Sequence, residues 1–173
     1  MLESGQVLDR YTIVRPLGRG GLATVYLVRH NRLGSLQALK VLAVPSTRVR
    51  GRLLREGRVQ AQLRHPNVAS VIDVLEVDGN PSLLMEYVNG PSLKLLLAKA
   101  ELNIDQIDDL ARGILTGVAA AHSRGLVHRD IKPGNVLLSI EPQRLVAKIT
   151  DFGLAKVLNE KQSGMQTRTG IAM

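Results

Sequence analysis

Short apolar runs separated by turn residues fill the first half of the chain. Five runs are rich in aliphatic and β-branched residues, and residues 31–34, Asn-Arg-Leu-Gly, form a turn between the second and the third. Asp78-Gly79-Asn80 separates the last two runs, and Asp-Gly favours a tight hairpin turn. The pattern predicts β-strands over residues 11–17, 24–29, 36–44, 68–77 and 82–88.

Two segments have a helical pattern. Residues 48–63 form the weaker one, because two glycines interrupt it. Residues 104–124 form the stronger one, because apolar residues recur every three or four positions. Asn103 is placed to cap this helix with Gln106 three positions on, and Gly125 is placed to end it. The predicted apolar stripe consists of Ile104, Ile107, Leu110, Ala111, Ile114, Leu115, Val118 and Ala121.

This order of elements predicts an α+β chain with two lobes. We expect an antiparallel sheet with one helix over residues 1–88, a junction at 86–90 and a helical part over 91–173, all in one domain. With 45% hydrophobic residues in 173, the chain can bury a core. The sequence contains no apolar run of about 18 residues and no signal-peptide pattern. The absence of Cys excludes disulfides and fits the cytoplasm.

The net charge of +8 raises the question of nucleic-acid binding. The basic residues are scattered, and Tyr11, Tyr26, Tyr87 and Phe152 are the only Phe, Tyr or Trp residues available for base stacking. We therefore interpret the charge as a solvated basic face, with no nucleic-acid partner.

Two features of the first lobe point to phosphate chemistry. Glycines at 18, 20 and 21 lie between two predicted strands, where backbone N–H groups can approach a phosphate. A dinucleotide site would need a helix after the glycines and an acidic residue about 20 positions on, but a strand follows and Lys40 stands there. Lys40 lies in an apolar strand, where its ammonium needs an anion such as Glu56 or a phosphate. Taken alone, an ordinary glycine-rich hairpin and a surface lysine remain open alternatives.

Two loops of the second lobe carry further candidates. Residues 128–135, His-Arg-Asp-Ile-Lys-Pro-Gly-Asn, combine a carboxylate, cations and an amide between apolar flanks that we expect to bury both ends. These types at this spacing suit a base, a phosphate-facing cation and a metal ligand. Asp151 ends a short apolar strand before Gly153, where a carboxylate can hold a divalent cation.

Together, and in this order, these four motifs resemble the signature of protein kinases, and the opening of the chain with residues 128–135 looks most like the bacterial Hanks-type Ser/Thr kinases. The resemblance covers nearly the whole chain from Tyr11. It implies a kinase-like bilobal fold and ATP-dependent phosphoryl transfer to Ser/Thr hydroxyls of proteins, with Mg²⁺, or Mn²⁺ in its place, as cofactor. It also allows a kinase dimer formed through the first lobe.

The resemblance implies a role for each matching residue. Asp130 would accept the proton of the substrate hydroxyl, Lys132 would steady the γ-phosphate, and Lys40 would contact the α- and β-phosphates and pair with Glu56. Asn135 and Asp151 would hold the metal. Met85 would be the gatekeeper residue of a hinge. The other implied ATP-binding residues are Leu17, Gly18, Arg19, Gly20, Gly21, Ala23, Val25, Ala38, Glu86, Val88 and Leu137.

Arg129 beside Asp130 resembles kinases controlled by phosphorylation of the activation segment, and Thr167 and Thr169 are the candidate acceptors. The pattern of the family continues with a substrate-binding stretch and further helices that do not follow here, so we expect weak or no activity from the 173 residues alone. Any membrane anchor would lie downstream.

Two alternatives from other classes remain. A small-molecule phosphotransferase of the aminoglycoside or choline kinase type shares the Lys, Asp, Asn and Asp logic, but usually has Gly where Arg129 stands. A non-catalytic nucleotide-binding module would be expected to lose at least one of four residues, and all four are present: Lys40, Asp130, Asn135 and Asp151.

Overall fold

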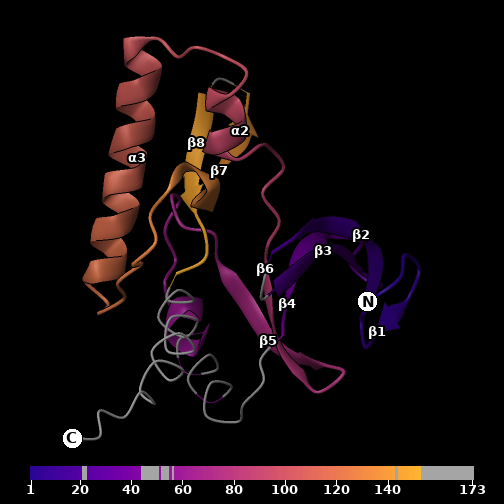
Figure 1. Cartoon of the computed structure of the whole chain (residues 1–173). Helices are drawn as coiled ribbons and strands as arrows, with labels where there is room; N and C mark the ends of the chain where they lie inside the picture. Colours follow the sequence, from indigo (N-terminus) through magenta and orange to yellow (C-terminus); the bar gives the residue numbers. More distant parts are fainter. Residues whose placement is uncertain (21–22, 44–50, 52–54, 56, 143, 153–173) are drawn as a thin grey trace, which may run out of the picture.

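The computed structural model describes the chain except residues 21–22, 44–50, 52–54, 56, 143 and 153–173, drawn in grey in Figure 1. Its strands are β1 (Val7–Leu8), β2 (Tyr11–Arg19), β3 (Ala23–His30), β4 (Leu36–Leu42), β5 (Val71–Val77), β6 (Asn80–Glu86), β7 (Val136–Glu141) and β8 (Arg144–Ile149). Its helices are α2 (Leu93–Leu97), α3 (Ile104–His122) and the 3₁₀ turn η1 (Pro133–Asn135). Residues 57–61 are also helical.

The first lobe is a curved antiparallel sheet with the strand order β1-β2-β3-β4-β6-β5 (Figure 1). Its core packs aliphatic and tyrosine side chains from most strands around Ile13, Val28 and Leu84, which are almost completely buried. The five predicted strands are present with ends shifted by up to three residues, and the predicted hairpin turn at 78–79 is confirmed. The pattern missed β1, which is only two residues long.

Residues 57–61 confirm part of the helix predicted over 48–63; much of its first half lies outside the described residues. Gly57 brings this helix close to the sheet, because a Cβ there would lie 3.1 Å from the Leu83 side chain. The helix is therefore packed against β6.

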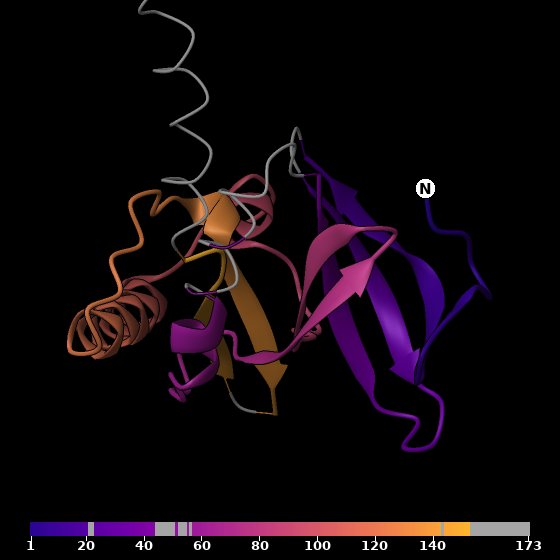
Figure 2. The ribbon, with the colours of Figure 1, turned by 90° about the horizontal axis from the view of Figure 1, so that it is seen from below.

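The second lobe combines α3 with the β7–β8 hairpin. Asn103 and Gln106 form the predicted capping box, and Gly125, with φ 72°, follows the helix end. The helix ends at His122 rather than residue 124, and the short helix α2 was not predicted. Figures 1 and 2 show the β7–β8 hairpin between α3 and the large sheet.

The predicted apolar stripe on α3 is only partly buried in this structure. Leu110 and Ala121 are buried, but Ile104 and Leu115 are 75% and 67% exposed. The reason is that only one narrow side of α3 packs against β8 and Asn67. On that side, Gly117 comes so close that a Cβ would lie 2.8 Å from the Asn67 backbone oxygen. Among the described residues, no helix is both long enough and apolar enough to span a membrane.

Candidate functional site

A cleft of about 450 Å³ lies between the large sheet and the second lobe. Ten of the predicted ATP-site and metal-site residues line it: Leu17, Gly18, Val25, Ala38, Lys40, Met85, Glu86, Val88, Leu137 and Asp151. The sequence interpretation missed Arg15, Tyr87, Gly90, Gly134 and Thr150, which line it too. The volume is within the range of small-molecule sites.

The large sheet forms one wall of the cleft, which we call the upper wall, and the second lobe forms the other, the lower wall. The residues of the upper wall follow from strand register. Val25 pairs with Lys40 across β3 and β4, and Ala38 pairs with Met85 across β4 and β6. Directly opposite residues, and residues two apart on one strand, share a face of the sheet. Val25, Ala38, Lys40 and Met85 therefore lie on the same face, which borders the cleft.

Lys40 is only 8% exposed, which excludes its interpretation as a surface lysine. Its Nζ lies 2.6 Å from Oδ1 of Asp151, and this carboxylate is the anion that the apolar surroundings require. Asp151 has a positive φ of 69°, an unusual conformation for a residue other than glycine. The predicted partner Glu56 lies outside the described residues.

Hydrogen bonds link the residues of the loop at 130–135. Nζ of Lys132 lies 2.6 Å from Oδ2 of Asp130. The Asn135 amide donates to the backbone oxygen of Asp130 at 2.8 Å and to its Oδ2 at 3.1 Å. Thr150, next to Asp151, donates its N–H to the Asn135 carbonyl at 2.9 Å. Together with the Lys40–Asp151 ion pair, these contacts form a continuous series of linked residues from Lys40 to Lys132.

His128 supports this loop from inside. Its ring is 2% exposed and packs on Phe152 at 4.7 Å between centroids. Nδ1 accepts from the Asp130 N–H at 3.2 Å, so Nε2 carries the proton that reaches the Thr150 carbonyl at 2.8 Å. The expected burial of the loop flanks is confirmed for Leu126, Val136 and Leu138 but wrong for Val127, which is 49% exposed.

The Asp130 carboxylate is stabilised in its ionised form. The hydrogen bond from Lys132 lowers its pKa, the hydrogen bond from Asn135 and the charge of Lys132 lower it further, and desolvation opposes them. The side chain remains 42% exposed. At neutral pH, Asp130 is therefore an ionised carboxylate that solvent can reach.

The junction after β6 offers hydrogen-bonding groups to the cleft. The Glu86 N–H already donates to the Ser70 carbonyl at 2.9 Å. The N–H of the buried Val88 makes no hydrogen bond within the described part of the chain, although its carbonyl accepts from Gly90. Because Val88 lines the cleft, its N–H is suited to donate to an acceptor atom of a ligand.

Other predicted residues lie elsewhere. Arg19, Gly20 and Ala23 border a separate hollow beside Met1, and the Gly20 N–H donates to the Ala23 carbonyl at 2.8 Å. The described structure thus gives no support for phosphate contacts from these three. Gly21 and the candidate phosphorylation sites Thr167 and Thr169 lie outside the described residues.

Among the described residues, no group of three or more His, Cys, Asp or Glu side chains could hold a metal ion. Mg²⁺ does not need one, because it usually takes one or two carboxylates, water and substrate phosphates. The amide nitrogen of Asn135 is used within the loop, which leaves its side-chain oxygen available. Asp151 and Asn135 therefore fit a magnesium site completed by phosphates.

Comparison with known proteins agrees with this geometry. The protein kinase domain family matches residues 11–172. The chain is 39% identical over 98% of its length to the probable serine/threonine-protein kinase PknB of Lactococcus lactis, and 33% identical over 96% to the serine/threonine-protein kinase pkn2 of Myxococcus xanthus. It spans only 27% and 21% of those two proteins.

Solved structures give the same result. The chain superposes on the PknI kinase domain of Mycobacterium tuberculosis (C20A_R136A double mutant) with a TM-score of 0.76 and 36% identity, covering 89% of this chain and 62% of that one. The predicted α+β bilobal fold of a kinase domain is confirmed. This chain belongs to the protein kinase family.

Proposed function

We propose that the natural product of this gene transfers the γ-phosphoryl group of ATP to Ser/Thr hydroxyls of proteins. The observation that carries the proposal is the continuous chain of contacts from Lys40 through Asp151, Thr150, Asn135 and Asp130 to Lys132, at the edge of a cleft of nucleotide size. Cations, a metal-binding pair and an ionised carboxylate are the groups that phosphoryl transfer needs in one place.

In this proposal, ATP inserts its adenine between Val25, Ala38 and Leu137 and accepts a hydrogen bond from the Val88 N–H. Lys40 neutralises charge on the phosphates. Asn135 and Asp151 would hold Mg²⁺, which supplies further charge neutralisation for the triphosphate when it is bound.

The substrate hydroxyl, Asp130 and Lys132 each have a role in the transfer step. The substrate hydroxyl oxygen forms a bond to the γ-phosphorus, its proton passes to the Asp130 carboxylate, and the bond from the γ-phosphorus to the bridging oxygen breaks as ADP leaves. Lys132, beside Asp130, stabilises the charge on the transferred group.

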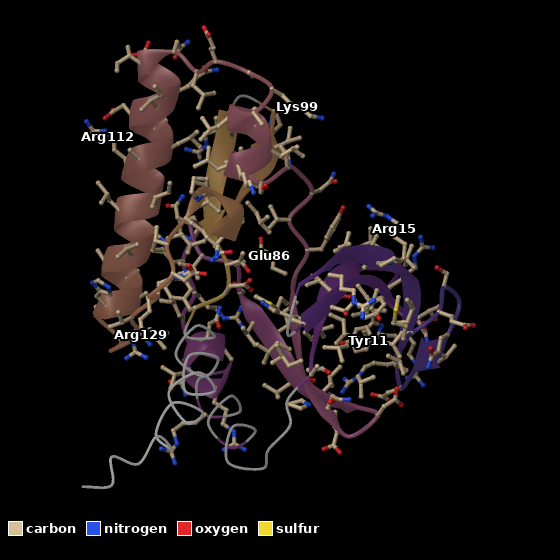
Figure 3. The ribbon with its side chains drawn as sticks, viewed as in Figure 1. Tyr11, Arg15, Glu86, Lys99, Arg112 and Arg129 are labelled. Carbon is tan, nitrogen blue, oxygen red and sulfur yellow. The ribbon has the colours of Figure 1, made fainter. Side chains whose placement is uncertain are left out.

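Several earlier expectations extend this proposal. Arg129 is exposed beside the site, with φ 67°, and would pair with phosphate on Thr167 or Thr169 (Figure 3). Double substitution of these threonines by Ala should then reduce autophosphorylation. The same set of proposals places residues 1–173 in one partial protein kinase domain. It also includes a dimer through the first lobe, protein substrates, the absence of nucleic-acid partners and a cytoplasmic location.

The experiment compares the natural gene product with its Asp130→Asn variant. Transfer of phosphate from Mg-ATP to a basic protein should fall about 10²- to 10⁴-fold, the usual contribution of a general base, while ADP affinity is retained. Asp78→Asn is the matched control, because Asp78 lies in the β5–β6 turn with φ 50°, where Asn is equally tolerated.

Each alternative function has its own outcome in this assay. Transfer to an aminoglycoside or choline, but not to protein, would favour a small-molecule phosphotransferase. Nucleotide binding with equal transfer by wild type and Asp130→Asn would contradict the assigned base. The 173-residue chain, assayed alone in parallel, tests the expectation that it is weakly active or inactive.

A further inference from the structure

An ion pair outside the reacting groups joins the two lobes beside the cleft. Lys148 of β8 lies opposite Leu137 of β7, and Leu137 lines the cleft. Lys148 does not line it. Its Nζ instead lies 2.7 Å from Oε1 of Glu86. Glu86, labelled in Figure 3, is at the end of β6, where the chain passes into the junction between the lobes.

Glu86 is held from a second side as well. Its Oε2 accepts from the Ser70 N–H at 3.2 Å, and its own N–H donates to the Ser70 carbonyl at 2.9 Å. The segment at 67–70 is in turn bonded to β8, since Ala69 donates to Ile149 and Ile149 donates to Asn67, both at 2.9 Å. Glu86 therefore sits where β8, the 67–70 segment and the junction meet.

The pair is shielded from solvent. The side chains of Lys148 and Glu86 are 14% and 32% exposed, whereas those of Arg144 and Glu141, on the same hairpin, are 69% and 41% exposed. An exposed pair contributes little, but removing one partner of a shielded pair leaves an uncompensated charge. The Lys148–Glu86 contact is therefore able to fix the position of Glu86.

We propose that Lys148 is a positioning residue for nucleotide binding: through Glu86 it fixes the edge of the cleft that receives adenine. Glu86 borders the cleft, and the Val88 N–H, which has no hydrogen-bond partner among the described residues, follows two residues later. The inference rests on the proposed function, because it assumes that adenine occupies this edge.

The test measures the dissociation constants of ADP and of adenosine for the natural gene product, by calorimetry. Lys148→Met should weaken both ligands by a similar factor, at least about fivefold, as expected for coupling between sites. Lys148→Arg should retain most of the affinity, because Arg keeps the pair. Arg144→Met removes the same charge from the same strand but breaks only the exposed pair, and it should change neither affinity.

Adenosine carries no phosphate, so it distinguishes a positioning role of Lys148 from electrostatic attraction between Lys148 and the phosphates. If Lys148→Met weakens ADP but not adenosine, Lys148 acts by attraction of the phosphates and the proposal is wrong. If it weakens neither, Lys148 has no role in binding. If the wild type binds neither ligand, the proposed function itself fails.

A double variant guards against misfolding. Glu86→Gln with Lys148→Met leaves no charge unpaired, so it should fold even where Lys148→Met does not. It should bind adenosine more weakly than wild type, and no more weakly than the worse single variant, because both changes break one contact. A folded double variant that binds adenosine like wild type would overturn the proposal.

Discussion

The two walls of the cleft are built in different ways. The upper wall consists of apolar side chains from regular strands, such as Val25, Ala38 and Met85. The lower wall includes Gly134, Thr150 and Asp151 from loops that are held by hydrogen bonds between side chains and backbone. In these loops Arg129 and Asp151 have φ values of 67° and 69°.

This difference separates binding from chemistry. A sheet face presents a smooth slot because its side chains alternate regularly. A loop can bring a carboxylate, an amide and a cation to one point, but only if the surrounding contacts hold its unfavourable backbone conformation. The upper wall is therefore suited to hold a flat ring, and the lower wall to hold reacting groups.

The largest effect, a loss of stability, should come from a substitution at Gly90 that forces the two walls apart at the segment that joins them. A Cβ on Gly90 would lie 1.9 Å from the backbone oxygen of Leu138, an atom that cannot move away without displacing β7. Gly90→Ala should lower the free energy of unfolding by about 3 kcal/mol, the upper range for overpacking. Chemical denaturation measures this loss.

Gly134→Ala is the matched control, because no atom lies within 4 Å of a Cβ at that position. Its free energy of unfolding should stay close to that of the wild type. Equal stability of Gly90→Ala and wild type would mean that the junction and β7 are not in close contact in solution.

A smaller effect is expected from a change to the upper wall alone. Ala38→Phe fills the slot between Val25 and Leu137, so ADP affinity should fall by about 1–3 kcal/mol, as for overpacking in a core. Calorimetric titration with ADP gives the value. Ala111→Phe on the exposed side of α3 introduces the same ring away from the cleft. If both variants bind ADP equally well, the slot is not the nucleotide site.

The sequence predicted the upper wall better than the contacts between the lobes. The resemblance to protein kinases implied Val25, Ala38 and Met85 as ATP-site residues, and all three line the cleft. The capping signal at Asn103 identified the start of α3. Such features depend on neighbours close in sequence or on a recognised motif.

Contacts between the two lobes could not be predicted in the same way. The pairing of Lys40 with Asp151, and of Lys148 with Glu86, joins residues far apart in the chain, and several opposite charges were available to each lysine. Similarly, the apolar pattern of α3 does not reveal that only one side of the helix meets β8 and Asn67. These contacts are decided by tertiary packing.

The smallest effect concerns the lower wall and should appear as a shift in pH dependence. Lys132 is the main cause of the lowered pKa of Asp130, so the carboxylate stays ionised further into acid than an ordinary Asp. In Lys132→Met that pKa should rise, and the pH below which phosphoryl transfer is lost should rise with it. The pH profile of kcat/KM measures this shift even if the maximal rate also falls. Lys99→Met, at an exposed position after α2, should leave the acid limb in place. An acid limb that stays fixed or moves to lower pH in Lys132→Met would contradict the assignment of Asp130 as the group that accepts the proton.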